Sequence, residues 1–145
     1  MSRGATGAYL LLLHMDGPRD VTVGALGRIG FARGTYVYVG SAMGGLEQRV
    51  ARHLREEKRM RWHIDHLLAS SDGVEALLVP STVDVECELA SFISAVPGAS
   101  PVRGFGCSDC RCCSHLFYVP EVMAECLRSL FPGPSRSSSP RQDAR

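Results

Sequence analysis

The hydrophobic positions of this chain follow the period of a strand in some segments and that of a helix in others. Residues 7–15 form an apolar run without a polar break from Leu10 to Leu13, which predicts a buried strand. In residues 36–39, valines alternate with tyrosines, the period-2 pattern of a strand. We expect this second strand to end at Gly40 and to be followed by a sharp connection over residues 41–45.

A helical pattern follows that connection. Leu46, Val50 and Leu54 are spaced four residues apart, so they lie on one face of a helix that we expect to run from Gly45 to about Glu57. The same periodicities predict the remaining elements: a strand at 21–23, a glycine-rich hairpin or bulged ribbon at 24–34, helices at 61–69, 85–96 and 121–130, and strands at 74–79 and 116–119. Asp84 or Thr82 is expected to cap the helix at 85–96.

Strands and helices therefore interleave along the chain, which predicts an α/β fold with a small mixed β-sheet flanked by helices. We expect one domain over residues 1–131. Residues 132–145 are rich in Pro, Ser and Arg and have almost no apolar positions, so we expect a disordered tail.

Composition changes this picture only a little. The chain has 145 residues and a formal net charge of +1, so an argument for an anionic partner must rest on local clusters of charge. The apolar run at residues 7–15 is too short to span a bilayer and lacks the context of a signal peptide. We therefore expect a soluble, cytoplasmic protein with no membrane partner, whose six cysteines stay reduced.

The strand at 36–39 and the following helix together suggest a catalytic site. Arg49 and His53 are four residues apart on a flank beside the apolar stripe, so both lie on one side of the helix. Across one short turn, Tyr38 can face this arginine and histidine. Arginine offers a permanently charged fork for a phosphate oxygen, and histidine can serve as an auxiliary base or donate to a phosphate.

These residues also carry a family resemblance. Gly7-Ala8-Tyr9, Tyr38-Val39-Gly40, Arg49, His53 and Glu86 occur in the order of the GIY-YIG nuclease signature, which they resemble. The resemblance extends to one small branch of that superfamily, found in archaea and bacteria and named only as a domain of unknown function, the 123 branch. The segments that resemble this branch are Arg61-Trp62-His63-Ile64-Asp65, Gly104-Phe105-Gly106, Ser108-Asp109-Cys110 and Ser114-His115-Leu116-Phe117.

The resemblance implies a GIY-YIG-like fold with the glycine-rich ribbon inserted between the two signature strands. It further implies a metal-dependent endonuclease that hydrolyses phosphodiester bonds, in DNA in preference to RNA, during DNA repair or the processing of structured DNA. In that reading Tyr9 is the general base, Tyr38 orients water or phosphate, and Glu86 binds one Mg²⁺ or Mn²⁺ ion. Glu88, which points to a different side of its helix, is the alternative metal ligand.

A basic stripe lies next to the predicted site. Between residues 49 and 61, six basic side chains outnumber two glutamates, giving a local net charge of +4. Such a stripe suits contacts to a phosphate backbone, although a solvated helix face explains it equally well. The residues predicted to bind nucleic acid are Arg52, Arg55, Lys58, Arg61 and His63. For His63, a buried hydrogen bond with Asp65 is an equal alternative, and Trp62 belongs either to the core or to a stacked base.

The later part of the chain offers a different chemistry. Cys107, Cys110, Cys112 and His115 are suitable ligands for Zn²⁺, but their spacing is compressed, and a thiol loop without metal is the alternative that we favour. The resemblance to the 123 branch implies a further alternative, in which Asp109 and His115 border the active site. Two other functions thus compete with the nuclease: a catalytically inactive module that binds nucleic acid, and an interaction domain that depends on zinc or thiols. The sequence identifies no protein partner.

Overall fold

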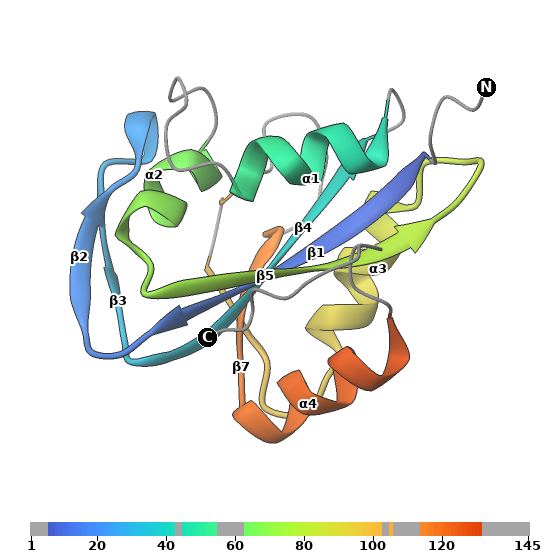
Figure 1. Cartoon of the computed structure of the whole chain (residues 1–145). Coiled ribbons are helices and arrows are strands. Elements are labelled where there is room, and N and C mark those ends of the chain that lie inside the picture. The colour runs from blue at the N-terminus through green and yellow to red at the C-terminus, as the bar shows by residue number, and fades with distance from the viewer. Residues whose placement is uncertain (1–5, 43–44, 55–62, 103–104, 106–113, 132–145) are drawn as a thin grey trace, which may run out of the picture.

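A computed structural model describes residues 6–42, 45–54, 63–102, 105 and 114–131, and these residues form an α/β structure (Figure 1). In chain order, the elements are β1 (Gly7–Met15), β2 (Arg19–Thr22), the 3₁₀ turn η1 (Gly24–Leu26), β3 (Arg28–Phe31), β4 (Gly34–Ala42), α1 (Leu46–Leu54), α2 (His63–Ser70), β5 (Gly73–Pro80), α3 (Glu86–Ser94), β6 (Ser100–Pro101), β7 (Leu116–Val119) and α4 (Glu121–Leu130).

The main sheet has five strands in the order β5-β1-β4-β7-β6. β1 lies between β5 and β4 and pairs with both of them. Because both of its faces are covered, β1 has no polar alternation, and Leu10 to Leu13 have no exposed surface. The apolar run seen in the sequence is thus the run of a central strand.

Two helices cover each face of this sheet (Figure 1). On one face, Tyr9, Leu11 and Leu13 pack with Val50 of α1 and Leu67 of α2. On the other face, residues from β1, β4 and β7 pack with residues from α3 and α4, among them Leu10, Val37, Leu89 and Leu127. Alternate side chains of each strand therefore belong to different cores.

The glycine-rich segment predicted as a hairpin at 24–34 contains only one strand of that hairpin, β3, because the partner strand β2 precedes it in the chain. β2 and β3 form a separate two-stranded ribbon. It extends the hairpin made by β1 and β4, whose last pair is Met15 with Gly34. Val21, Val23 and Phe31 from the ribbon segment join the core beneath α2. The ribbon thus shares the face of the sheet that carries α1 and α2 (Figure 1).

The α/β class, the sheet flanked by helices and the ribbon between the two signature strands are confirmed, and the bounds of β7 and α4 are those predicted from periodicity. Two details differ. Every pair in the main sheet is antiparallel, whereas we predicted a mixed sheet. β4 also continues through Gly40 to Ala42, because residues 40–42 pair with the first three residues of β1.

The helix expected at 45–57 is described from Leu46 to Leu54, and the one expected at 61–69 from His63 to Ser70. The predicted tail at 132–145 lies outside the described residues. Within the part of the chain that the structure describes, no helix has the length and apolar character needed to cross a membrane.

Candidate functional site

The phenol ring of Tyr9 lies over the neighbouring strand β4 at a glycine. Tyr9 of β1 pairs in register with Gly40 of β4. A Cβ atom built on Gly40 would overlap the phenol of Tyr9. Glycine is therefore required here by the close approach of the ring rather than by its backbone conformation.

Three aromatic rings meet on the face of the sheet that α1 covers. The hydroxyl of Tyr9 and Nε2 of His53 are 2.7 Å apart and hydrogen bonded, and their ring centroids are 5.2 Å apart. The ring of Tyr38 lies 6.5 Å from Tyr9 and 6.5 Å from His53. Tyr9 and His53 are each 2% exposed, whereas Tyr38 is partly exposed, so Tyr38 is the more accessible of the two phenols.

Both phenols hold their protons strongly. Burial raises the pKa of Tyr9 well above its usual value, while the guanidinium of Arg49, within hydrogen-bonding reach of the Tyr9 hydroxyl, acts in the opposite direction. Burial also raises the pKa of Tyr38, and the neighbouring Tyr9 and Glu86 add to this effect. In the protein without substrate, both tyrosines are therefore neutral hydrogen-bonding groups rather than phenolates.

Arg49 reaches the same place from α1. Its Nη1 donates a hydrogen bond of 3.1 Å to the backbone carbonyl of Ser41. The carbonyl of Gly45 accepts from the backbone N–H of Arg49 at 3.2 Å. Because β4 continues past Gly40, the Ser41 carbonyl stands at the end of the strand, where it positions the guanidinium beside Tyr9.

Glu86, the first residue of α3, contacts the end of β4 from the face of the sheet opposite to α1. Its Oε1 accepts a hydrogen bond of 3.2 Å from the hydroxyl of Ser41, and its Oε2 lies 2.9 Å from Nδ1 of the buried His115. Asp84 was one of two predicted caps, but the N-cap position is Val85, which has no side-chain capping hydrogen bond. Asp84 instead stands one residue earlier and accepts the backbone N–H of Glu86 at 3.0 Å. Glu88 of the same helix is exposed.

Ser41 thus connects the two halves of the site, since its carbonyl accepts from Arg49 and its hydroxyl donates to Glu86. Sequence reasoning missed Ser41. Its only signal was a small polar residue directly after the Tyr-x-Gly motif. The resemblance had suggested that His115 could border the active site, but it did not identify Glu86 as the residue that His115 contacts.

The donor set around Glu86 is compatible with a shared metal ion. In the described residues, no three His, Cys, Asp or Glu side chains are grouped closely enough to form a complete metal site. Mg²⁺ is commonly held by one or two carboxylates, with waters and substrate phosphates as the other ligands. The side chain of Glu86 is 25% exposed, so it can offer an oxygen to such an ion.

Family membership follows from comparison with known sequences. The family model described as "Domain of unknown function DUF123" matches residues 8–134. The chain belongs to the DUF123 family. The match runs from the second residue of β1 through α4 and so includes every residue of the site described above. No curated protein and no solved structure matches the chain.

Arg52 of this DUF123 domain has a structural partner. Its Nη1 and Nη2 donate to the two carboxylate oxygens of Asp65 at 3.0 and 3.1 Å. Asp65 is completely buried, so this bidentate pair fastens α1 to α2. The predicted contact of Arg52 with nucleic acid stays a prediction.

Other predicted residues of the DUF123 domain cannot be placed. His63 is the first residue of α2, but its side chain lies outside the described part of the structure. Also outside the described residues are Arg55, Lys58, Arg61, Trp62, Cys107, Cys110 and Cys112. The structure therefore describes only Arg49 and Arg52 of the basic stripe and only His115 of the suggested zinc ligands, and the rest of these two predictions is carried by the sequence.

Proposed function

We propose that this protein is a metal-dependent endonuclease that hydrolyses phosphodiester bonds in DNA. The observation that carries the proposal is the convergence of five predicted residues at the end of β4. Tyr9, Tyr38 and His53 are in mutual contact, and Arg49 and Glu86 both bind Ser41. The resemblance to GIY-YIG nucleases supports the same chemistry from the order of these residues in the sequence.

Hydrolysis of a phosphodiester requires that the attacking water lose a proton. The hydrogen bond between Tyr9 and His53 provides a route for it. The oxygen of Tyr9 takes the proton from water as its own proton passes to Nε2 of His53. The raised pKa of Tyr9 suits this transfer, because the phenol never has to persist as a phenolate.

Negative charge grows on the phosphoryl oxygens during attack and must be stabilised. Arg49 is the cation whose charge acts on the Tyr9 phenol, and it can bind a phosphate oxygen at the point where the water is activated. Tyr38, the more exposed phenol, is placed to donate a hydrogen bond to the water or to the phosphate.

Glu86 would hold the metal ion, with Ser41 and His115 fixing its carboxylate. A bound Mg²⁺ or Mn²⁺ would neutralise the scissile phosphate and assist departure of the leaving oxygen. Glu86 lies at the start of α3, where the helix dipole favours a carboxylate. A role in DNA repair or in processing branched or flapped DNA is the biological context that we propose, on the breadth of the GIY-YIG superfamily.

The test is strand scission of a defined set of DNA substrates, namely duplex, single-stranded, nicked, flapped and branched, with Mg²⁺ or Mn²⁺. We expect the wild-type protein to cut at least one of them. Arg49→Ala and Glu86→Ala should each lower cutting by about 100-fold or more, as is typical when a group that stabilises transition-state charge is removed.

Glu88→Ala is the matched control, because Glu88 is an exposed glutamate on the same helix. We expect this variant to cut like the wild type. Loss of cutting in Glu88→Ala, together with normal cutting in Glu86→Ala, would move the metal ligand to Glu88. Cutting by Arg49→Ala at the wild-type rate would refute the proposed site.

Binding without scission of any substrate would instead favour the inactive nucleic-acid-binding module. Stoichiometric zinc without nucleic-acid binding would favour the zinc- or thiol-dependent interaction domain.

A further inference from the structure

A hollow lies on the same face of the sheet as the tyrosines of the site. It has a volume of about 370 Å³ and lies between the loop that joins β3 to β4 and the edge strand β6. Its lining includes Phe31, Tyr36, Tyr118 and Val102, with Arg33 as its charged residue. This volume is at the lower end of the range for small-molecule sites.

The floor of this pocket is rigid and aromatic. Phe31 and Tyr36 are almost fully buried and meet edge to face, with ring centroids 5.4 Å apart. The Tyr36 hydroxyl donates to the backbone carbonyl of Ala32 at 2.9 Å. Tyr118 stands 5.7 Å from Tyr36, and its side chain stays partly exposed, so an aromatic surface is available to a planar ligand.

Arg33 gives the pocket its charge. Its side chain is exposed and, in the described part of the chain, forms no ion pair or side-chain hydrogen bond. An uncommitted guanidinium beside an aromatic surface suits a ligand that has both a planar ring and an anionic group.

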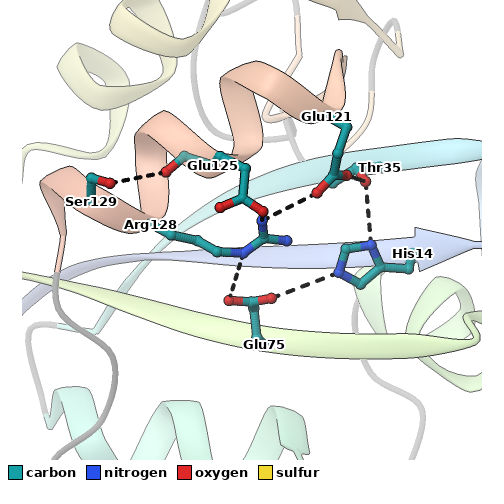
Figure 2. A network of polar contacts seen from close by, with 7 residues as sticks. All are labelled: His14, Thr35, Glu75, Glu121, Glu125, Arg128 and Ser129. Carbon is teal, nitrogen blue, oxygen red and sulfur yellow. Dashed lines mark hydrogen bonds and ion pairs between the residues drawn. The ribbon is translucent and has the colours of Figure 1, made fainter.

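Acidic side chains lie on the other side of Arg33 and Tyr118, away from the pocket. A neighbouring hollow of about 350 Å³ is lined by both of these residues and by Asp16 and Glu121. Behind it, Glu75, Glu121 and Glu125 gather around the single Arg128 (Figure 2). These carboxylates disfavour an anionic chain on that side, so we expect a chain bound at Arg33 to run along β4 toward the site.

The pocket is aligned with the proposed catalytic residues. Tyr36 and Tyr38 are two residues apart on the same face of β4, a separation of about 7 Å. This is also about the spacing of successive phosphates in an extended strand of nucleic acid. The other wall of the pocket also leads to the site. The carbonyl of Val102, a lining residue, accepts the backbone N–H of Phe105 at 3.2 Å, and the ring of Phe105 lies 6.1 Å from that of Tyr38.

We propose that this pocket binds an unpaired nucleobase of the DNA substrate, next to the phosphate held at Tyr38. The base packs against Tyr118 over the floor made by Phe31 and Tyr36, and Arg33 binds the adjoining backbone phosphate. A base inside a duplex is stacked on both sides and cannot enter, so the preferred substrate has a single-stranded segment beside the cut. This proposal rests on the proposed function.

The test measures binding in the presence of EDTA, so that no cutting is needed. Fluorescence anisotropy of labelled oligo(dT) of about 12 nucleotides is compared with that of a blunt duplex of equal length, using the full chain. We expect the single strand to bind more tightly. Arg33→Glu should weaken its binding about tenfold and reduce the dependence of the logarithm of affinity on log salt by about one unit.

The chain offers matched controls for both parts of the pocket. Arg28→Glu makes the same charge change at an exposed ribbon residue outside the pocket and should have a much smaller effect. Tyr118→Leu should weaken binding of the single strand by about fivefold or more, because stacking is lost, whereas Tyr118→Phe should retain it. Thermal melting of each variant checks that the fold is intact.

Two results would overturn this proposal. One is equal weakening by Arg33→Glu and Arg28→Glu, and the other is equal binding by folded Tyr118→Leu and Tyr118→Phe. A protein that still cuts DNA under either result would leave the nuclease intact and remove only the base pocket. Pocket-dependent binding of the single strand, with no cutting of any substrate, would instead support the base pocket and count against the nuclease.

Discussion

At the scale of single residues, the site depends on a side chain that is missing. The absence of a Cβ atom at Gly40 lets the phenol of Tyr9 lie over β4 and reach Nε2 of His53. Gly40 of the Tyr-x-Gly motif therefore leaves the space that the Tyr9 ring occupies. It does not end β4, which continues to Ala42.

We expect Gly40→Ala to displace the Tyr9 phenol and to destabilise the protein by about 1–3 kcal/mol, the usual cost of overpacking a core. The rate of DNA cutting by this variant should be lower than that of the wild type, because the displaced phenol loses its hydrogen bond with His53. The control is Gly73→Ala, at which a Cβ would stand 3.7 Å from the His14 ring, an ordinary contact. Urea denaturation of both variants measures the difference, and equal stability would contradict this role of Gly40.

The raised pKa values of Tyr9 and Tyr38 predict how stability depends on alkaline pH. The folded protein binds these protons more tightly than the unfolded chain, whose tyrosines ionise near pH 10. The contribution is therefore complete below about pH 10 and is lost as the pH rises above it. We expect the free energy of unfolding to fall above that pH.

Tyr38→Phe removes one of these groups, so the alkaline loss of stability should be smaller than in the wild type. The measurement is urea denaturation at a series of pH values from about 8 to 11. An identical pH dependence in the two proteins would show that burial does not raise the pKa of Tyr38.

The helical spacing of Arg49 and His53 is a local property, so the sequence predicted their common side, while Tyr9 and Glu86 were predicted from the family resemblance. The structure places Tyr9, Tyr38 and His53 together and Arg49 and Glu86 on Ser41, and their catalytic roles stay a prediction. The sequence was not enough to predict that Ser41 joins Arg49 to Glu86. That contact depends on how far β4 pairs with β1, and the register of two strands separated by a ribbon cannot be read from either strand.

At the scale of elements, the ribbon illustrates the same limit. Its glycines predicted a hairpin at 24–34, but they did not show that the first strand is β2, before that segment, or that α2 is the ribbon's neighbour. The structure shows one polar attachment: Arg19 of β2 donates to Asp72 at 2.7 Å through Nη2 and to the carbonyl of Ser70 at 2.6 Å through Nη1. Asp72 also accepts the backbone N–H of Asp16 at 2.7 Å.

We expect Asp72→Asn to loosen the ribbon without unfolding the sheet, because an amide loses the ion pair with Arg19. Hydrogen exchange of the amides in β2 and β3 should become faster, while exchange in β1 stays slow. Asp20→Asn is the control, since its exposed pair with Arg28 lies within the ribbon itself. Equal acceleration in the two variants would show that the Asp72 contact does not hold the ribbon.

At the scale of the whole molecule, α4 is fastened to the sheet by one arginine (Figure 2). Arg128 donates to Glu75 of β5 at 3.0 Å, and to Glu121 and Glu125 of its own helix at 3.2 and 2.9 Å. Glu121 also accepts from Thr35 of β4 at 2.8 Å, and this hydrogen bond and Arg128 hold the pKa of Glu121 below its usual value. Three elements distant in sequence, β4, β5 and α4, are thus joined by one ion pair and one hydrogen bond.

We expect Arg128→Met, which keeps the apolar stem, to lower the free energy of unfolding by about 1–2 kcal/mol. Glu125→Gln, which changes only a pair between neighbouring turns of α4, should cost less than about 0.5 kcal/mol. Denaturation near neutral pH compares them. If the two variants lose the same stability, the pair between Arg128 and Glu75 does not secure α4.

The pair of Met15 with Gly34 has a consequence for how related chains are recognised. The ribbon begins after Met15 and ends before Gly34, and these two residues are paired across β1 and β4. The length of the ribbon therefore does not alter the distance between Tyr9 and Tyr38. The number of residues between the two halves of the motif is consequently free to vary in evolution. A search that allows any gap at this point, but requires the Arg49 to His53 interval, should detect relatives that a fixed spacing would reject.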